Sequence, residues 1–292
     1  LALTAGGGWA ACGLFEPFFD NDDDDPDADP SPSDGPTTDD QTGIEVEIES
    51  RFGEDHETFT GTEGNDVFRT EDVITDFNIT IQAGGGEDLI TVGDGNIRVN
   101  AGEGDDTIVG DGQELTLRGG PGDDTIELLN VAGEQSRAFG GSGNDVLTGE
   151  GDIILNGGEG DDTLSLVGPD VWYLYGPTAT GGAGADTFEV AMQVETEEYN
   201  GPLVSAVITD FDPDEDQLEV SMIDTEYYRY ESHELVEEDG NTIVTVNFEA
   251  LSQEDLGEYP QWFREDTPCV VVLEGVTGLS VDDISFVRSA AV

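Results

Sequence analysis

Apolar and polar residues alternate in many short stretches of this chain, at regular intervals from residue 44 to beyond residue 190. In seven stretches one apolar residue stands at the same offset between polar neighbours: Phe68, Ile90, Ile108, Ile126, Leu147, Leu164 and Phe188. A second series carries two apolar residues separated by one other residue: Ile79 and Ile81, Ile97 and Val99, Leu115 and Leu117, Ile153 and Leu155. This period of two predicts short, half-buried strands. We expect the first series to stack as an inward ladder.

A glycine-rich phrase precedes each strand of the first series. It reads as two small residues, any residue, glycine, a mostly polar residue and aspartate, and it stands at 61–66, 83–88, 101–106, 119–124, 140–145, 157–162 and 181–186. Successive copies start 22, 18, 18, 21, 17 and 24 residues apart. One coil is then a turn, a short strand, an opposite turn and a second short strand. The sequence therefore predicts an all-β fold, a right-handed parallel β-roll or β-helix, with the seven turns piled along one edge.

The glycine-rich turns also have the chemistry of a calcium site. Glycine permits the positive φ at which carbonyl groups crowd one point, and each aspartate adds a carboxylate. Such hard oxygens are the ligands that Ca²⁺ takes. We expect several ions, about six, shared between neighbouring turns. The predicted ligands are the first, third and sixth residues of each turn: Gly61, Glu63, Asp66, Ala83, Gly85, Asp88, Ala101, Glu103, Asp106, Gly119, Pro121, Asp124, Gly140, Ser142, Asp145, Gly157, Glu159, Asp162, Gly181, Ala183 and Asp186.

Other acidic turns leave two interpretations open. The opposite turns at 93–95, 110–112 and 149–151 lack the full phrase, so Asp94, Asp111 and Glu150 either hold further ions or belong to plain glycine turns. After the repeats, Asp210 or Asp216 either supplies a calcium ion that closes the last coil or lies in a solvated acidic turn. The spacing there lacks the glycine and the final glutamate of an EF-hand.

The repeats resemble the haemolysin-type, or RTX, calcium-binding nonapeptide. Segments 207–220 and 270–287 resemble the region that follows the repeats in type I secreted RTX proteins of Gram-negative bacteria, where it caps the roll and carries the export signal. The resemblance implies a C-terminal β cap and an extracellular or cell-surface location. It also implies a compartment switch, in which the chain stays unfolded in a calcium-poor cytoplasm and folds outside.

The net charge of the chain excludes some classes of binding partner. The chain has 68 Asp and Glu against 8 basic residues, for a formal charge of −60. Self-repulsion on this scale opposes compaction, so counter-ions belong to the molecule. Binding to nucleic acid or to anionic lipid through charge is not expected. Cys12 and Cys269 give no disulfide framework, and calcium takes that role.

Shifts in composition suggest four segments. Residues 1–19 are apolar and glycine-rich, 20–43 form an acidic, proline-bearing linker, 44–204 form the calcium-binding roll with a capping strand at 44–50, and 205–292 form the cap and secretion region. The first segment is the end of a membrane anchor, the end of a secretory signal with Cys12 in a poor lipobox, or a mobile end. A membrane contact is expected only through that segment.

Catalytic motifs are missing from the sequence. It has no His-Glu-x-x-His or Gly-x-Ser-x-Gly phrase, and His56 and His233 are far apart. We therefore expect no enzyme but a structural or adhesive protein whose extracellular glycan or protein partner the sequence does not name. The alternative is a calcium-dependent β-helix that acts on acidic polysaccharide, with Arg98 or Arg137 as base, or a glycan-binding module. The aromatic residues Trp172, Tyr173, Tyr175, Tyr227, Tyr228 and Tyr230 either stack on a ligand or cover the end of the core.

Overall fold

The computed structural model describes residues 43–48, 56–70, 78–168, 176–192, 203–224, 228–251 and 266–289, all within one compact unit, Asp40–Val292. Strands dominate these residues, and their one helical element is a single 3-10 turn, η1, Val281–Asp283. Within the same ranges, no helix has the length and hydrophobicity needed to cross a bilayer. The predicted segment 1–19, nearly all of 20–43, Cys12, Trp172, Tyr173, Tyr175 and Tyr227 lie outside the described residues.

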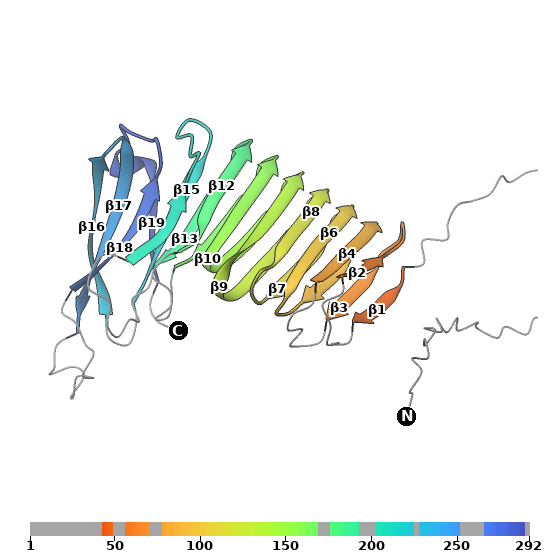
Figure 1. The fold of residues 1–292 in the computed structure, drawn as a ribbon. Coiled ribbons are helices and arrows are strands. Elements are labelled where there is room, and N and C mark those ends of the chain that lie inside the picture. The colour runs from red at the N-terminus through yellow and green to blue at the C-terminus, as the bar shows by residue number, and fades with distance from the viewer. Residues whose placement is uncertain are drawn as a thin grey trace, which may run out of the picture. The chain divides into compact units, whose positions relative to one another are not determined.

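Two stacks of parallel strands form the roll, and the chain alternates between them (Figure 1). The first stack contains β1 (Glu45–Ile48), β3 (Val67–Thr70), β5 (Leu89–Val92), β7 (Thr107–Asp111), the first parts of β9 (Thr125–Ser142) and β10 (Val146–Glu159), β11 (Thr163–Val167), β13 (Thr187–Met192), β15 (Gln217–Ile223) and β19 (Ser285–Ser289). The second contains β2 (His56–Thr60), β4 (Asn78–Gly85), β6 (Asn96–Glu103), β8 (Thr116–Pro121), the second parts of β9 and β10, β12 (Thr178–Ala183), β14 (Leu203–Ile208) and β18 (Asp266–Leu273).

The predicted inward ladder is confirmed. Its seven residues, Phe68 to Phe188, pair in register from coil to coil, and each is at most 1% exposed. The second stack supplies the facing ladder, with Ile81, Val99, Leu117, Ala138, Leu155 and Ala179 in register and buried. Side chains of the two stacks therefore fill one continuous core. The all-β and parallel β-roll predictions are confirmed as well.

Two glycines replace large residues inside this core. Gly110 in β7 and Gly149 in β10 are buried, where the neighbouring coils have Val92, Leu128 and Leu166. A Cβ on Gly149 would lie 2.1 Å from Cδ1 of Ile153. The space of the absent side chain is thus taken by a residue of the opposite stack, as interdigitated packing requires.

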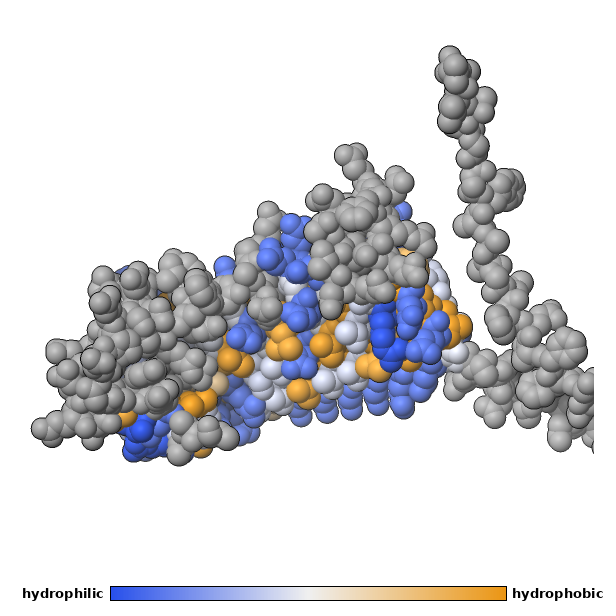
Figure 2. All heavy atoms as spheres, turned by 90° about the horizontal axis from the view of Figure 1, so that it is seen from below, coloured by the Kyte–Doolittle hydropathy of each residue, from blue (hydrophilic) through white to orange (hydrophobic). Residues whose placement is uncertain are grey.

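The C-terminal region extends the same stacks and then closes them. β14 and β15 pair with β12 and β13, and β18 and β19 form the last parallel rung. Between these rungs the hairpin of β16 (Tyr228–Glu238) and β17 (Asn241–Ala250) adds antiparallel strands beside β18. Viewed from below, apolar surface residues form separate patches, whereas hydrophilic residues repeat along one margin (Figure 2).

An ion pair ties the last strand to the hairpin. Arg288 Nη2 in β19 lies 2.8 Å from Asp224 Oδ2, and the N–H of Tyr230 in β16 donates to Asp224 Oδ1 at 2.9 Å. Burial raises the pKa of Asp224, but these donors outweigh it and the net shift is downward. The carboxylate thus links β16 to β19 while it stays ionised at neutral pH.

Candidate calcium-binding edge

In the six turns from 83–88 onward, two glycines have a backbone conformation that only glycine adopts easily. In the turn at 101–106, Gly102 has φ +131° and Gly104 has φ +124°. Their Cα atoms also lie against the preceding coil: an added Cβ would be 1.9 Å from the carbonyl oxygen of Gly84 and 2.0 Å from that of Gly86. The second and fourth positions of the phrase are therefore fixed both by φ and by the close stacking of coils.

The sixth-position aspartates form one continuous ladder of hydrogen bonds. The main-chain N–H of each aspartate donates to Oδ1 of the aspartate in the next coil, over 2.7 to 2.9 Å, through Asp66, Asp88, Asp106, Asp124, Asp145, Asp162 and Asp186. Every one of the seven is 1 to 3% exposed. The structure thus brings these predicted site residues together along one edge of the roll.

Both ends of this aspartate ladder are closed by other groups. At the first coil the N–H of Ile44 donates to Asp66 Oδ1 at 2.6 Å. At the last, the N–H of Asp186 donates to Asp216 Oδ1 at 2.9 Å, while Asp216 Oδ2 accepts the N–H of Asp212 at 2.8 Å. Asp216 therefore serves as an eighth rung. Asp210 accepts the N–H groups of Gly181 and Gly182, each at 2.9 Å, and so holds the last glycine turn.

The second carboxylate oxygen is buried without a partner in five consecutive coils. Among the described side chains, Oδ2 of Asp88, Asp106, Asp124, Asp145 and Asp162 accepts no hydrogen bond. Burial raises the pKa of Asp106 and Asp145 to about 7 and that of Asp88, Asp124 and Asp162 to about 6, against the lowering effect of the ladder hydrogen bonds, with neighbouring carboxylates adding to the rise. Burial raises the pKa of Asp186 too. A buried acceptor without a donor is costly, and a cation is the group that it lacks.

A carbonyl oxygen of the next coil lies close to this unpaired oxygen. A Cβ on Gly157 would be 2.1 Å from Asp162 Oδ2 and 2.6 Å from the carbonyl oxygen of Gly181. The same pair of oxygens surrounds Gly140, where they belong to Asp145 and Gly157. The first-position carbonyl and the sixth-position carboxylate of adjacent turns therefore converge, which fits the shared calcium site expected from the sequence.

The third-position carbonyls have a hydrogen-bond partner of their own. Those of Glu103, Pro121, Ser142, Glu159 and Ala183 each accept the N–H of the fourth-position glycine in the preceding coil, at 2.8 or 2.9 Å. The side chains of Glu63, Glu103 and Glu159 are exposed. A calcium ion that binds these carbonyl oxygens would thus bind atoms that already accept a backbone hydrogen bond.

A second ladder, which sequence analysis missed, runs beside the first in the opposite direction. It joins fifth-position residues: the N–H of each donates to the side-chain oxygen of the preceding coil, in the pairs Glu87 to Asn65, Asp123 to Asp105, Asn144 to Asp123, Asp161 to Asn144 and Ala185 to Asp161. These residues are exposed. Asn and Asp have the same side-chain length, and their recurrence at this position is the signal that predicts such a ladder.

The opposite edge has simpler hydrogen bonds. Asp94 Oδ1 accepts the N–H of Gln113 at 3.1 Å, and Ser136 Oγ accepts the N–H of Leu115 at 3.0 Å. Over the described part of the chain, no three His, Cys, Asp or Glu side chains gather as a metal site. Calcium bound at the glycine-rich edge would therefore be held mostly by main-chain carbonyls, with one carboxylate from each turn.

Comparison with known proteins agrees with this geometry. Four segments, 53–72, 80–96, 116–128 and 137–164, match the RTX calcium-binding nonapeptide repeat. They include five of the seven turns, and the turns at 101–106 and 181–186 carry the same ladder hydrogen bonds. The chain therefore contains repeats of the RTX calcium-binding type. No curated protein matches it.

Proposed function

We propose that this protein is a calcium-loaded β-roll which folds when it reaches the calcium outside the cell, and which acts there or at a bacterial surface as a structural or adhesive element rather than as an enzyme. The observation that carries the proposal is the row of five buried Oδ2 atoms with no hydrogen-bond partner. Four of their five turns lie in segments that match a repeat defined by calcium binding. The role outside the cell is supported by the type of repeat and by the charge.

Repulsion between the ladder carboxylates explains why the folded chain would depend on bound calcium. The aspartates of the ladder stack at the strand spacing of about 4.8 Å, and two carboxylates about 5 Å apart at an effective dielectric of 20 repel by roughly 3 kcal/mol. A site that exists only in the folded chain stabilises it by about 2.7 kcal/mol when free calcium is a hundred times the dissociation constant. Several such sites rival the net stability of a typical domain.

Export gives this requirement a use. In a cytoplasm poor in free calcium, the repulsion along the edge favours the open chain, which a secretion channel can pass. Outside, calcium would fold each coil and prevent the chain from slipping back. In this proposal the aspartate ladder is both the ion site and the sensor of the compartment.

Circular dichroism during a calcium titration tests the proposal. We expect a cooperative change from coil to β structure at roughly 10⁻⁴ to 10⁻³ M calcium, the range of extracellular modules, and none with magnesium, which demands tighter octahedral geometry and retains water. A spectrum rich in β structure in chelator, and unchanged by calcium, would contradict it.

A further inference from the structure

The outer surface of the second strand stack carries a group of positive charges in a strongly acidic molecule. Arg98 on β6, Arg118 on β8 and Arg137 on β9 come from three consecutive rungs, and all three side chains are exposed. In register with them, Asn100, Thr116 and Phe139 also point outward. We call these six residues the arginine face.

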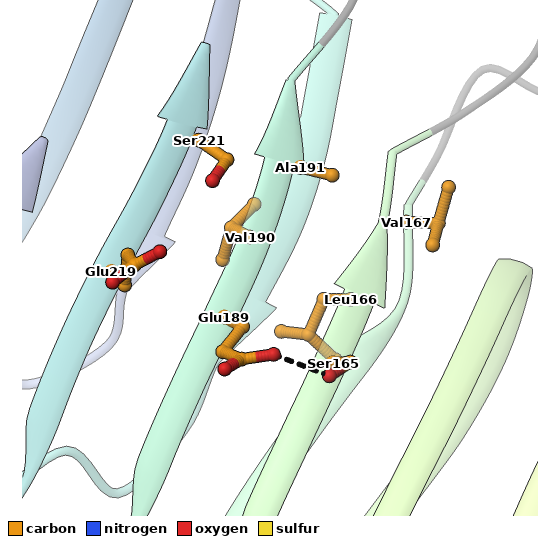
Figure 3. A pocket seen from close by; sticks show the side chains of 8 residues that line it. All are labelled: Ser165, Leu166, Val167, Glu189, Val190, Ala191, Glu219 and Ser221. Atoms are coloured by element: carbon orange, nitrogen blue, oxygen red, sulfur yellow. Dashed lines mark hydrogen bonds between the residues drawn. The ribbon is translucent and has the colours of Figure 1, made fainter. Parts of the chain in front are cut away.

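Among the residues that the structure describes in the two outward rows of this surface, none carries a carboxylate. Its two outward rows continue through Thr80 and Gln82 on β4 and through Ile154 and Asn156 on β10, and none of these positions is Asp or Glu. In the whole chain almost one residue in four is acidic. The first stack differs: there Glu189 and Glu219 stand on neighbouring strands beside Ser165, whose Oγ donates to Glu189 at 2.7 Å (Figure 3).

The three guanidinium groups are available to a ligand. The ion pairs found among the described residues join Arg69 to Glu45 and Arg229 and Arg288 to Asp224, so none involves the arginine face. Arg118 lies over the ring of Phe139 at 4.7 Å, which holds its planar group against the sheet. Arg98 and Arg137 stand two rungs apart, roughly 10 Å at the usual strand spacing.

Chemistry and charge together select the ligand. Guanidinium groups bind carboxylate or sulfate oxygens through paired hydrogen bonds, and the threonine, asparagine and glutamine side chains around them both donate to and accept from hydroxyl groups. A densely charged chain such as DNA, with one charge per about 1.7 Å, would be repelled by the net charge of −60. A polymer with many hydroxyls and widely spaced anions suffers less repulsion.

We propose that the arginine face binds an acidic polysaccharide, laid across the strands so that its anionic groups meet successive arginines. This binding goes beyond calcium-dependent folding, since calcium only has to keep the roll folded. It gives the adhesive role a defined surface and a defined chemical class of partner.

Binding of hyaluronate, which has a carboxylate on every second sugar, tests the proposal by calorimetry at saturating calcium. The variants are Arg137→Gln, Arg98→Gln/Arg137→Gln and the control Arg69→Gln, which removes the same charge as the first variant from the other stack. Losing one charged hydrogen-bond partner should weaken binding by about 10 to 100-fold, and losing two should weaken it further. Arg69→Gln should leave it unchanged, and Thr116→Arg, between the two arginines, should tighten it.

Several results would overturn the proposal. One is equal binding by wild type and Arg137→Gln, because calcium bridging at the aspartate edge would then explain the affinity. Another is no binding of hyaluronate by any variant, and a third is single-stranded DNA bound as tightly with the same dependence on arginine. Neutral dextran should not bind. If the roll stays folded in chelator and still binds there with the same loss in Arg137→Gln, the proposal stands and the calcium switch fails.

Discussion

The main-chain N–H of Asp145 donates a hydrogen bond of 2.8 Å to Oδ1 of Asp162 in the next coil. The same carboxylate keeps its Oδ2 buried and unpaired. In each of the five aspartates with an unpaired Oδ2, the two oxygens therefore have different tasks: one oxygen joins the coils, and the other remains for a cation. A substitution can separate these tasks.

Asp145→Asn should stabilise the calcium-free roll and weaken the calcium-bound one. Asparagine retains the Oδ1 acceptor for the N–H of Asp124 but carries no charge, so the cost of burying a carboxylate disappears. The pKa of Asp145 is raised from 3.8 to about 7. At pH 8 the ionised carboxylate therefore destabilises the calcium-free roll by roughly 1 to 4 kcal/mol. We expect a higher unfolding free energy in chelator and a smaller gain on adding calcium.

Asp123→Asn is the matched control, because it removes the same charge from an exposed fifth position and retains the acceptor for Asn144. Denaturant unfolding with and without calcium measures both quantities. Equal behaviour of the two variants would show that net charge, and not the ladder position, sets the calcium response.

The stability of the calcium-free roll should fall as pH rises. The ladder aspartates have a folded-state pKa of about 6 to 7 against 3.8 in a free chain. A raised pKa means that their favourable contribution is complete below pH 3.8 and is lost as pH rises through about 6 to 7. Thermal unfolding in chelator at about pH 5 and pH 8 checks this direction.

Calcium binding should release protons in the same window, because the bound ion requires the ionised carboxylate. Calorimetry in buffers of different ionisation enthalpy should find release at about pH 6 and almost none at about pH 8. Release that does not change between these two pH values would exclude the ladder aspartates as the titrating groups.

Gly149→Ala should overpack the core, and Ile153→Val should relieve it. The new Cβ would meet Cδ1 of Ile153 at 2.1 Å, and overpacking costs about 1 to 3 kcal/mol. Valine lacks that Cδ1 atom. Denaturant unfolding of the single and double variants should show the double to be more stable than the sum of the single effects by at least about 0.5 kcal/mol. Simple additivity would mean that the strand shifts instead.

Glu87→Asn should extend the fifth-position ladder. Among the described turns this ladder is interrupted at Glu87, whose longer side chain does not accept the N–H of Asp105, whereas Asn65 and Asn144 accept from their neighbours. One more hydrogen bond should add about 0.5 to 1.5 kcal/mol to the unfolding free energy. Glu87→Gln removes the same charge without the shorter reach, so a gain as large as that of Glu87→Asn would point to charge alone.

The roll could be predicted from the sequence because its two repeating patterns, the offset of the apolar residue from the aspartate and the alternation along each strand, are local. Phe68 and Ile90 follow their aspartates at one offset, and strand alternation then fixes which side faces the core. Gly110 shows the limit of such reasoning, since it looked like part of a turn but lies buried at the end of a strand. An added Cβ there would lie 2.9 Å from Cδ1 of both Leu115 and Leu117, which explains why that position has no side chain of its own.

The hydrogen bonds of the edge were less accessible to sequence analysis. The position of each aspartate indicated the site, yet no local pattern shows that its Oδ1 accepts an N–H 17 to 24 residues away. Asp216 illustrates this, because it continues the ladder although no glycine phrase precedes it. A rung depends on the stacking of coils, which is a property of the folded roll.

The repetition of the aspartate ladder makes one coil an exchangeable length of chain. Both Asp106 and Asp124 are followed by a threonine and an isoleucine in the same register, so joining Asp106 to Thr125 would remove 18 residues and restore the same junction. Since each coil contacts mainly its neighbours, the two ends would meet unchanged surfaces. Duplication or loss of whole coils is therefore a route by which such a protein can change the length of its roll during evolution, while the segments that close the two ends of the aspartate ladder stay the same.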